Sequence, residues 1–253
     1  MKHKDDLVFD KLVWHENFSA YEGVPDPEKW FIETGIRNDM EAQYYTAESE
    51  NVSVKGGVLN LTAVKKDCGS KPYTSGSIKS VGKGWKYGRF DICAKLPAGI
   101  GMWPAIWMMP VNSEYGNWPR SGEIDIMEQV GCDPTVIHGT LHTGKFSHLR
   151  NTDRAGYKDL KTATSEFHIY SIEWQPSHMD FFVDDELYYS VVKGEETVAG
   201  YENEEDRILA WPFDKEFFLI LNTAVGGGWA GMDGIDDEKF PQGMEVKYVK
   251  IYQ

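Results

Sequence analysis

The chain has 253 residues, 41% hydrophobic and 26% charged, so it can bury a sizeable core and is typical of globular proteins. Asp and Glu number 40 against 26 Lys and Arg, and the resulting net charge of −14 repels nucleic acid and anionic lipid surfaces. No run of about 18 apolar residues is present, which excludes a transmembrane helix. No repeat, linker or break in composition divides the sequence, so we expect one domain over residues 1–253.

Targeting and redox signals are weak. The first six residues lack the apolar stretch of a signal peptide, so either the protein is cytoplasmic or a signal has been removed. Cys68, Cys93 and Cys132 cannot all pair, and no CxxC spacing occurs. Neither a disulfide framework nor a zinc knuckle is therefore indicated, and the redox compartment stays open.

The elements predicted in chain order are almost all strands. The clearest helix signal is Asp26 to Trp30, where an N-cap Asp precedes Pro27 at the first helical position and predicts one or two turns. Alternating apolar residues and turn signals predict strands at residues 51–54, 58–62, 89–96, 123–128, 138–143, 167–174, 179–183, 187–192, 216–225 and 245–252. Many short strands with little helix indicate an all-β fold, a two-sheet antiparallel sandwich or jelly roll. Such a fold hosts both enzymes and lectins.

The segment Ser121 to Gln129 carries the chemistry. In a strand, Glu123 and Asp125 lie on one face, and strict alternation would then place Met127 beside them and Glu128 in the core. An ionised glutamate in an apolar core is strongly unfavourable. One extra residue, a β-bulge, removes the conflict because it returns Glu128 to the acidic face.

Three carboxylates then form a row. Glu123 and Glu128 would lie roughly 13 Å apart at Cα, and side chains that lean inward bring their carboxyl groups to roughly 5 to 6 Å. That separation is near the ~5 to 5.5 Å of retaining glycosidases and below the ~6.5 to 9.5 Å of inverting ones. Asp125 between them can share a proton, raise the pKa of the acid/base and hold the nucleophile in orientation. The alternative is a solvated strand face or a calcium site, since hard cations also bind several carboxylates.

The sequence around the acids favours catalysis. Trp103, Trp107 and Trp118 stand just upstream, beside Pro, Gly and Asn residues, although a β-rich core also uses aromatic residues. Downstream, residues 138–143 carry two His and two Thr at alternate positions. Carboxylates, flat amphipathic rings and polar hydrogen-bonding side chains together are typical of a sugar-binding cleft.

At these residues the chain resembles glycoside hydrolase family 16 enzymes of the laminarinase type, which are endo-β-1,3(4)-glucanases. The matching stretches are residues 87–89, 96–97, 101–110, 121–128, 138–142, 221–227 and 248–253, nearly end to end. The resemblance implies a concanavalin-like jelly roll with Glu123 as nucleophile, Asp125 as assisting acid and Glu128 as general acid/base. The extra Met127 is similar to the bulged, laminarinase-like branch, whereas lichenases with a plain ExDxE motif lack it.

The resemblance also implies a set of substrate-binding side chains: Trp103, Trp107, Trp118, His142, Asn222 and Trp229. Each has a structural alternative, since a Trp can belong to the core and a lone His is more often a structural hydrogen-bonding residue. Residues 38–45 resemble the family's Asn…Glu-x-Gln-Tyr-Tyr segment. Met40 stands where many relatives carry a polar residue, so sugar contacts from that loop are not expected.

The sequence thus predicts an endo-acting, retaining glycoside hydrolase that cleaves β-1,3 or mixed β-1,3/1,4-glucans, such as laminarin, lichenan or barley β-glucan, by double displacement. One rival is a non-catalytic, lectin-like glucan-binding module, which would not require acids at both catalytic positions. Another is a sibling enzyme on a different polysaccharide: an agarase, a carrageenase or a xyloglucan-active enzyme. We expect a monomer whose partner is a β-glucan polysaccharide or oligosaccharide. Because polymeric glucan cannot enter a cell, this function implies a secreted or periplasmic protein.

No cofactor is expected for catalysis. Relatives often hold a structural calcium ion far from the cleft, bound by backbone carbonyls near the first strands and by an Asp in the final strand. Lys247 stands where that Asp is usual, so we predict no metal at that site.

Overall fold

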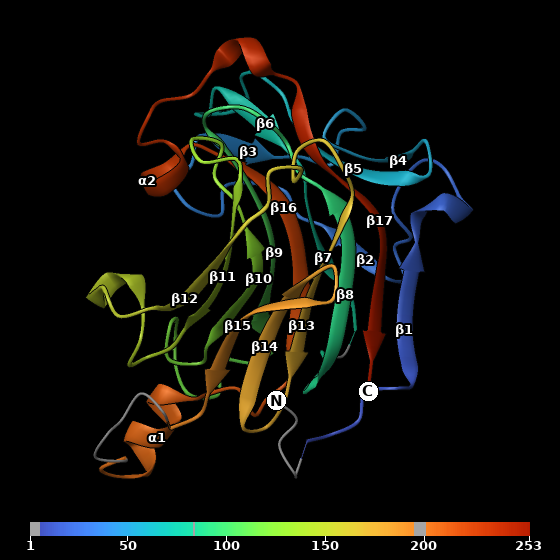
Figure 1. Ribbon diagram of the computed structural model, residues 1–253. Helices are drawn as coiled ribbons and strands as arrows, with labels where there is room; N and C mark the ends of the chain where they lie inside the picture. Colours follow the sequence, from blue (N-terminus) through green and yellow to red (C-terminus); the bar gives the residue numbers. More distant parts are fainter. Residues whose placement is uncertain (1–5, 83, 195–200) are drawn as a thin grey trace.

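The computed structural model describes residues 6–82, 84–194 and 201–253, and these form two antiparallel sheets (Figure 1). The eight-stranded sheet has the order β15-β14-β13-β8-β17-β5-β4, with β1 also paired to β17, and the seven-stranded sheet has the order β12-β11-β10-β9-β16-β7-β2. A short parallel pair, β3 and β6, adds a third sheet. The predicted all-β, two-sheet antiparallel sandwich is confirmed.

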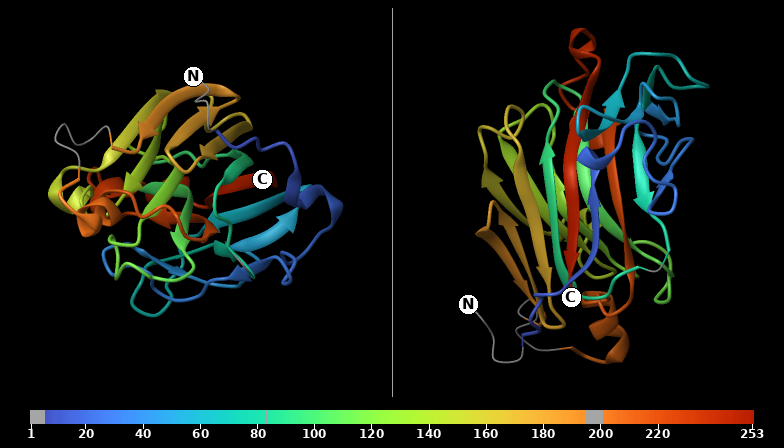
Figure 2. Two further views of the ribbon diagram at one scale, coloured as in Figure 1. Left: turned by 90° about the horizontal axis from the view of Figure 1, so that it is seen from below. Right: turned by 90° about the vertical axis from the view of Figure 1, so that its right-hand side faces the viewer.

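The strands of the eight-stranded sheet are β1 (Leu12–Asn17), β4 (Val52–Lys55), β5 (Val58–Ala63), β8 (Gly88–Lys95), β13 (His168–Trp174), β14 (His178–Val183), β15 (Glu186–Val192) and β17 (Gln242–Tyr252). Those of the seven-stranded sheet are β2 (Trp30–Ile32), β7 (Ser77–Ser80), β9 (Met102–Pro110), β10 (Glu123–Glu128), β11 (Val136–His142), β12 (Arg154–Asp159) and β16 (Phe217–Val225). The pair is β3 (Gln43–Tyr45) and β6 (Tyr73–Ser75). Among the described residues, two α-helices, α1 (Glu204–Ala210) and α2 (Gly227–Ala230), lie outside the sheets, and α1 lies at the same end of the molecule as the C-terminus (Figures 1 and 2).

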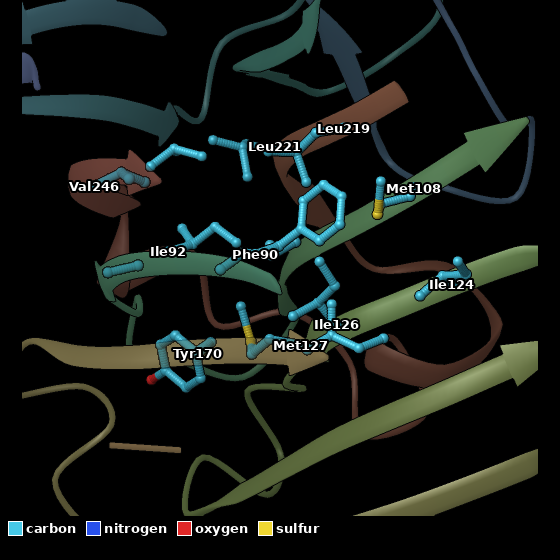
Figure 3. Close-up of a cluster of buried hydrophobic side chains, with 14 of the residues drawn as sticks. Phe90, Ile92, Met108, Ile124, Ile126, Met127, Tyr170, Leu219, Leu221 and Val246 are labelled. Carbon is cyan, nitrogen blue, oxygen red and sulfur yellow. The ribbon is translucent and has the colours of Figure 1, made fainter. Parts of the chain in front are cut away.

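The core fills the space between the two sheets. Phe90 and Ile92 of β8 point inward and are fully buried, and on the facing sheet Met108, Ile124 and Ile126 do the same (Figure 3). Burial of each such side chain stabilises the fold by about 1.5 to 3 kcal/mol. Since the inward face of the seven-stranded sheet is apolar, its polar residues project from the opposite face, and that outer face carries the acids.

The predicted helix at residues 26–30 is wrong. The Asp26 side chain does cap a turn, because its Oδ1 accepts from the Glu28 amide at 2.9 Å and its carbonyl accepts from the Trp30 amide at 2.8 Å. The chain then enters β2 at Trp30, whose side chain is only 2% exposed and packs against Trp14 and Phe18. Burial of this indole in the sandwich prevails over a helix too short to be stable alone.

Local turn chemistry accounts for the elements that the sequence predicts well. The hairpin of β4 and β5 turns at Gly56 and Gly57, both at positive φ. The hairpin of β14 and β15 turns at Asp184 and Asp185, with φ of 51° and 63°, a conformation that aspartate tolerates.

Helix α1 was not predicted, although the Asn203 side chain caps it by accepting from the Asp206 amide. No helix within the described part of the chain is long and apolar enough to cross a membrane.

Candidate active site

A β-bulge in β10 brings the three acids to one face of the sheet. Against β11 the register shifts by one residue between Asp125 and Glu128, and against β9 it shifts between Asp125 and Met127. Ile126 and Met127 consequently both enter the core, where they are 1% and 0% exposed (Figure 3). Glu123, Asp125 and Glu128 share the outer face, as the sequence predicts.

Cross-strand pairing determines what surrounds the acids, because paired residues on neighbouring strands project from the same face. Two rows of paired residues cross β16, β9, β10 and β11 in that order. The first row consists of Asn222, Ala105, Glu128 and His138, and the second consists of Ile220, Trp107, Asp125 and Thr140. The acids therefore lie in a surface built by the central strands of the sheet and not by loops alone. Rigid strands hold reactive groups with better precision than loops do.

Two indole N–H groups donate hydrogen bonds to the outer acids. Trp103 Nε1 donates to Glu128 Oε1 at 3.0 Å, and Trp118 Nε1 donates to Glu123 Oε2 at 2.6 Å. Both glutamates are half-buried, whereas Trp118, in the loop before β10, is 37% exposed. An indole N–H can only donate, so each bond stabilises the ionised form of its glutamate.

Burial raises the pKa of all three acids. Desolvation raises the pKa of Glu123 and of Glu128 to about 7. Asp125 is only 2% exposed, and burial together with the charges of both glutamates raises its pKa well above the usual range. The site thus holds protons at neutral pH on carboxyl groups that would be ionised in water.

The neighbours distinguish the two glutamates. Against the effect of burial, three groups lower the pKa of Glu123: the Trp118 N–H, the Asp125 carboxyl through a hydrogen bond, and the Arg37 charge. The Trp103 N–H likewise lowers the pKa of Glu128, whereas the charge of Glu123 raises it. We infer that Glu123 ionises before Glu128 and that Asp125 keeps its proton longest, donating it in a hydrogen bond to Glu123.

His142 lies beside Asp125, with Nε2 3.4 Å from Oδ2. The imidazole is 7% exposed, and burial and the nearby His148 lower its pKa to about 4, so the ring is neutral at neutral pH. Its ring centroid is 6.1 Å from that of Trp118. Within residues 6–82, 84–194 and 201–253, neither Asp125 Oδ2 nor His142 Nδ1 has a hydrogen-bond partner.

Arg37 is a candidate functional residue that the sequence analysis missed. Its Nη1 donates to Asn222 Oδ1 at 3.2 Å, and Trp107 Nε1 donates to the same oxygen at 2.7 Å. The guanidinium carbon lies 5.0 Å from the centroid of the Trp107 ring and 4.9 Å from that of Tyr45, and Glu33 accepts from Nη2. Arg37 thus holds both Trp107 and Asn222, two residues that the sequence does predict. The sequence does offer one indication of Arg37, because this basic residue directly precedes the family-like segment of residues 38–45 in a chain that is acidic as a whole.

The segment of residues 38–45 supports β16. Gln43 Oε1 accepts from the Val225 amide at 2.8 Å, and the Tyr45 hydroxyl accepts from Asn222 Nδ2 at 3.1 Å. Met40 is 72% exposed. Tyr45 therefore positions Asn222, and Gln43 holds the end of β16 at Val225.

Trp229 of α2 contacts the acid row through Trp103. Its ring packs edge-on against Trp103, with centroids 5.7 Å apart, and against His138 at 4.9 Å. Gly227 makes this approach possible, because its φ is +79° and a Cβ there would lie 3.1 Å from the Trp103 ring. Trp229 consequently orients the indole that donates to Glu128.

The structure also locates the residues considered for metal and disulfide chemistry. Among the described residues, one group of His, Cys, Asp and Glu side chains has a spacing suited to a metal ion: Glu123, Asp125 and His142. Lys247 is exposed, and its Nζ lies 3.9 Å from the centroid of the Phe167 ring. The three cysteines are free thiols.

A β-sandwich whose sheet carries paired carboxylates between indole donors is typical of a glycoside hydrolase. Residues 39–239 match the model of Glycosyl hydrolases family 16, and the chain belongs to this family. The chain is 47% identical over 249 residues to a beta-glucanase from Rhodothermus marinus, an alignment that covers 96% of this chain and 85% of that protein.

Solved structures extend this likeness to the whole fold. The laminarinase from Rhodothermus marinus matches with a TM-score of 0.89 and 45% identity over 96% of this chain and 97% of that chain. SCLam, a non-specific endo-beta-1,3(4)-glucanase from family GH16, matches with a TM-score of 0.85 and 38% identity over 98% and 94% of the two chains. The resemblance found in the sequence and the jelly-roll fold are confirmed.

Proposed function

We propose that this chain is an endo-acting, retaining β-1,3(4)-glucanase. The observation that carries the proposal is the bulge in β10, which puts Glu123 and Glu128 on one face with Asp125 between them. Its similarity to a beta-glucanase and to a laminarinase supports a β-glucan as the substrate.

The two glutamates have different roles in this proposal. Glu128, with its raised pKa, protonates the leaving glycosidic oxygen, while ionised Glu123 attacks the anomeric carbon and forms a glycosyl ester. Glu128, now a base, takes a proton from water, which releases the sugar from Glu123. The proton that Asp125 shares with Glu123 reduces the negative charge that the leaving carboxylate regains.

The rival functions fit the site less well. A lectin-like module would not require two acids with pKa values raised to about 7 beside indole donors. A sibling enzyme on agarose, carrageenan or xyloglucan would keep the same acids, so only the substrate distinguishes it. No described feature of the site favours these polymers over a β-glucan.

A substrate panel tests the proposal. Release of reducing sugar from laminarin, barley β-glucan, agarose and xyloglucan is measured in parallel, with Glu123→Ser as the inactive control. We expect cleavage of laminarin and barley β-glucan. Activity on a galactan alone would overturn the glucanase assignment and leave the family intact.

The stereochemistry of the first product tests the roles of the acids. Proton NMR of a fresh β-glucan digest should show the β-anomer first, since two displacements retain configuration. An initial α-anomer would mean inversion and would contradict Glu123 as nucleophile.

The remaining expectations follow from the same proposal. Carboxylates supply all of the chemistry in this proposal, so prolonged dialysis against EDTA should leave the activity unchanged. We also propose that no calcium ion binds near Lys247, so the same dialysis should leave the melting temperature unchanged. A polymeric substrate requires a secreted or periplasmic enzyme, which fractionation of the source cells tests. We also propose a monomer, and light scattering of the full chain measures its mass.

A further inference from the structure

One side of the acid row has the composition of a metal site. One ligand atom each of Glu123, Asp125 and His142 lies within 4.8 Å of the other two. Asp125 is 2% exposed and His142 is 7% exposed. Asp125 Oδ2, which lies 3.4 Å from His142 Nε2, is a buried polar atom without a hydrogen-bond partner in the described part of the chain, and this is unfavourable unless another group binds it.

We propose that Glu123, Asp125 and His142 form an inhibitory site for a divalent transition metal of the Zn²⁺ class. Two carboxylates and one imidazole are the donor types that Zn²⁺ prefers, and water can complete a four-coordinate shell. Ca²⁺ and Mg²⁺ need six or more oxygen ligands and rarely accept imidazole, so they should bind poorly. This role differs from that of a cofactor, because the metal would occupy groups that the reaction needs free.

The arrangement of the cluster supports a dication. Glu123 and Asp125 lie on one face of β10, and His142 of β11 is the direct cross-strand partner of Glu123. Two carboxylates held this close repel one another, and a dication between them would remove that repulsion.

The metal and the sugar exclude one another. Bound Zn²⁺ would hold the Glu123 carboxylate and stop its attack on an anomeric carbon. This step of the inference rests on the proposed function. Glu128 lies outside the group of three and keeps its bond to Trp103. Inhibition should therefore be competitive with glucan and reversed by EDTA.

Direct binding to the full chain without an affinity tag is the test. Isothermal titration with ZnCl₂ should show one site per chain, and Co²⁺ should give the visible absorption of a four-coordinate site. His142→Gln and Glu123→Gln should each weaken Zn²⁺ binding about tenfold or more. The matched controls His148→Gln and Glu128→Gln change the same residue types next to the group and should weaken it much less. A Cys68→Ser/Cys132→Ser variant tests for binding by thiols, and circular dichroism confirms that each variant folds.

Four results would overturn the inference: unchanged Zn²⁺ affinity in both His142→Gln and Glu123→Gln, equal loss in the His148→Gln control, loss of binding in the cysteine variant, or inhibition that added glucan does not relieve. Because the titrations contain no sugar, a chain that binds Zn²⁺ at these residues yet hydrolyses no glucan would refute the proposed function alone.

Discussion

The indole N–H bonds to Glu123 and Glu128 predict opposite changes in the pH profile of hydrolysis. Trp118→Phe removes the donor to Glu123, and Trp103→Phe removes the donor to Glu128, while both keep an aromatic ring. Each N–H stabilises a carboxylate, so its loss raises the pKa of that glutamate. Catalysis needs Glu123 ionised and Glu128 protonated, so the two variants affect different limbs of the profile.

The magnitude follows from the strength of one charge-assisted hydrogen bond. Such a bond contributes about 1.5 to 3 kcal/mol, and we take the lower end because Trp118 is 37% exposed. At about 1.4 kcal/mol per pKa unit, each limb should move by about one pH unit. Trp118→Phe should shift the acidic limb upward and narrow the profile. Trp103→Phe should shift the alkaline limb upward and widen it.

The assay is kcat/KM on a soluble glucan oligosaccharide from pH 4 to pH 9. Loss of the ring surface lowers the height of the profile, so only the positions of the limbs are compared. The two limbs report the titration of the coupled pair, and both variants are therefore measured against the wild-type chain under the same conditions. If both variants move the same limb, or neither moves one, the assignment of nucleophile and acid/base is wrong.

Four further substitutions test the site and the core behind it. Glu123→Ser should abolish turnover and keep oligosaccharide binding, whereas Glu128→Ala should recover activity on an aryl glycoside whose leaving group needs no proton, as kinetics on both substrates will show. Met127→Ala should destabilise the fold by about 2 to 5 kcal/mol in urea unfolding, because it leaves a cavity where a fully buried side chain stood, and a change below about 1 kcal/mol would contradict its place in the core. Arg37→Lys keeps the charge but loses the planar fork, so kcat/KM should fall about tenfold, and wild-type kinetics would show that Arg37 does not position Trp107.

The acid row could be predicted from local sequence because a strand has a strict period of two. Ile124 and Ile126 identify the buried face, and an ionised Glu128 cannot be placed there, so the bulge follows from the order of residues alone. Hairpin turns such as Asp184-Asp185 are equally local, since two residues with positive φ define them. The sandwich class follows from many such short strands, and the family resemblance from the motif around Glu123.

Contacts between distant segments were decided only by the tertiary structure. Arg37 and Asn222 are 185 residues apart in sequence, and their hydrogen bond exists because the segment after β2 folds against β16, where the Ala42 amide donates to the Val225 carbonyl at 2.8 Å. Residues 26–30 have a helix signal, yet the burial of Trp30 between the sheets makes them a turn that leads into a strand. Local propensity amounts to less than about 1 kcal/mol per residue, whereas burial of one large side chain contributes more, so the packed sandwich and not the local pattern determines such positions.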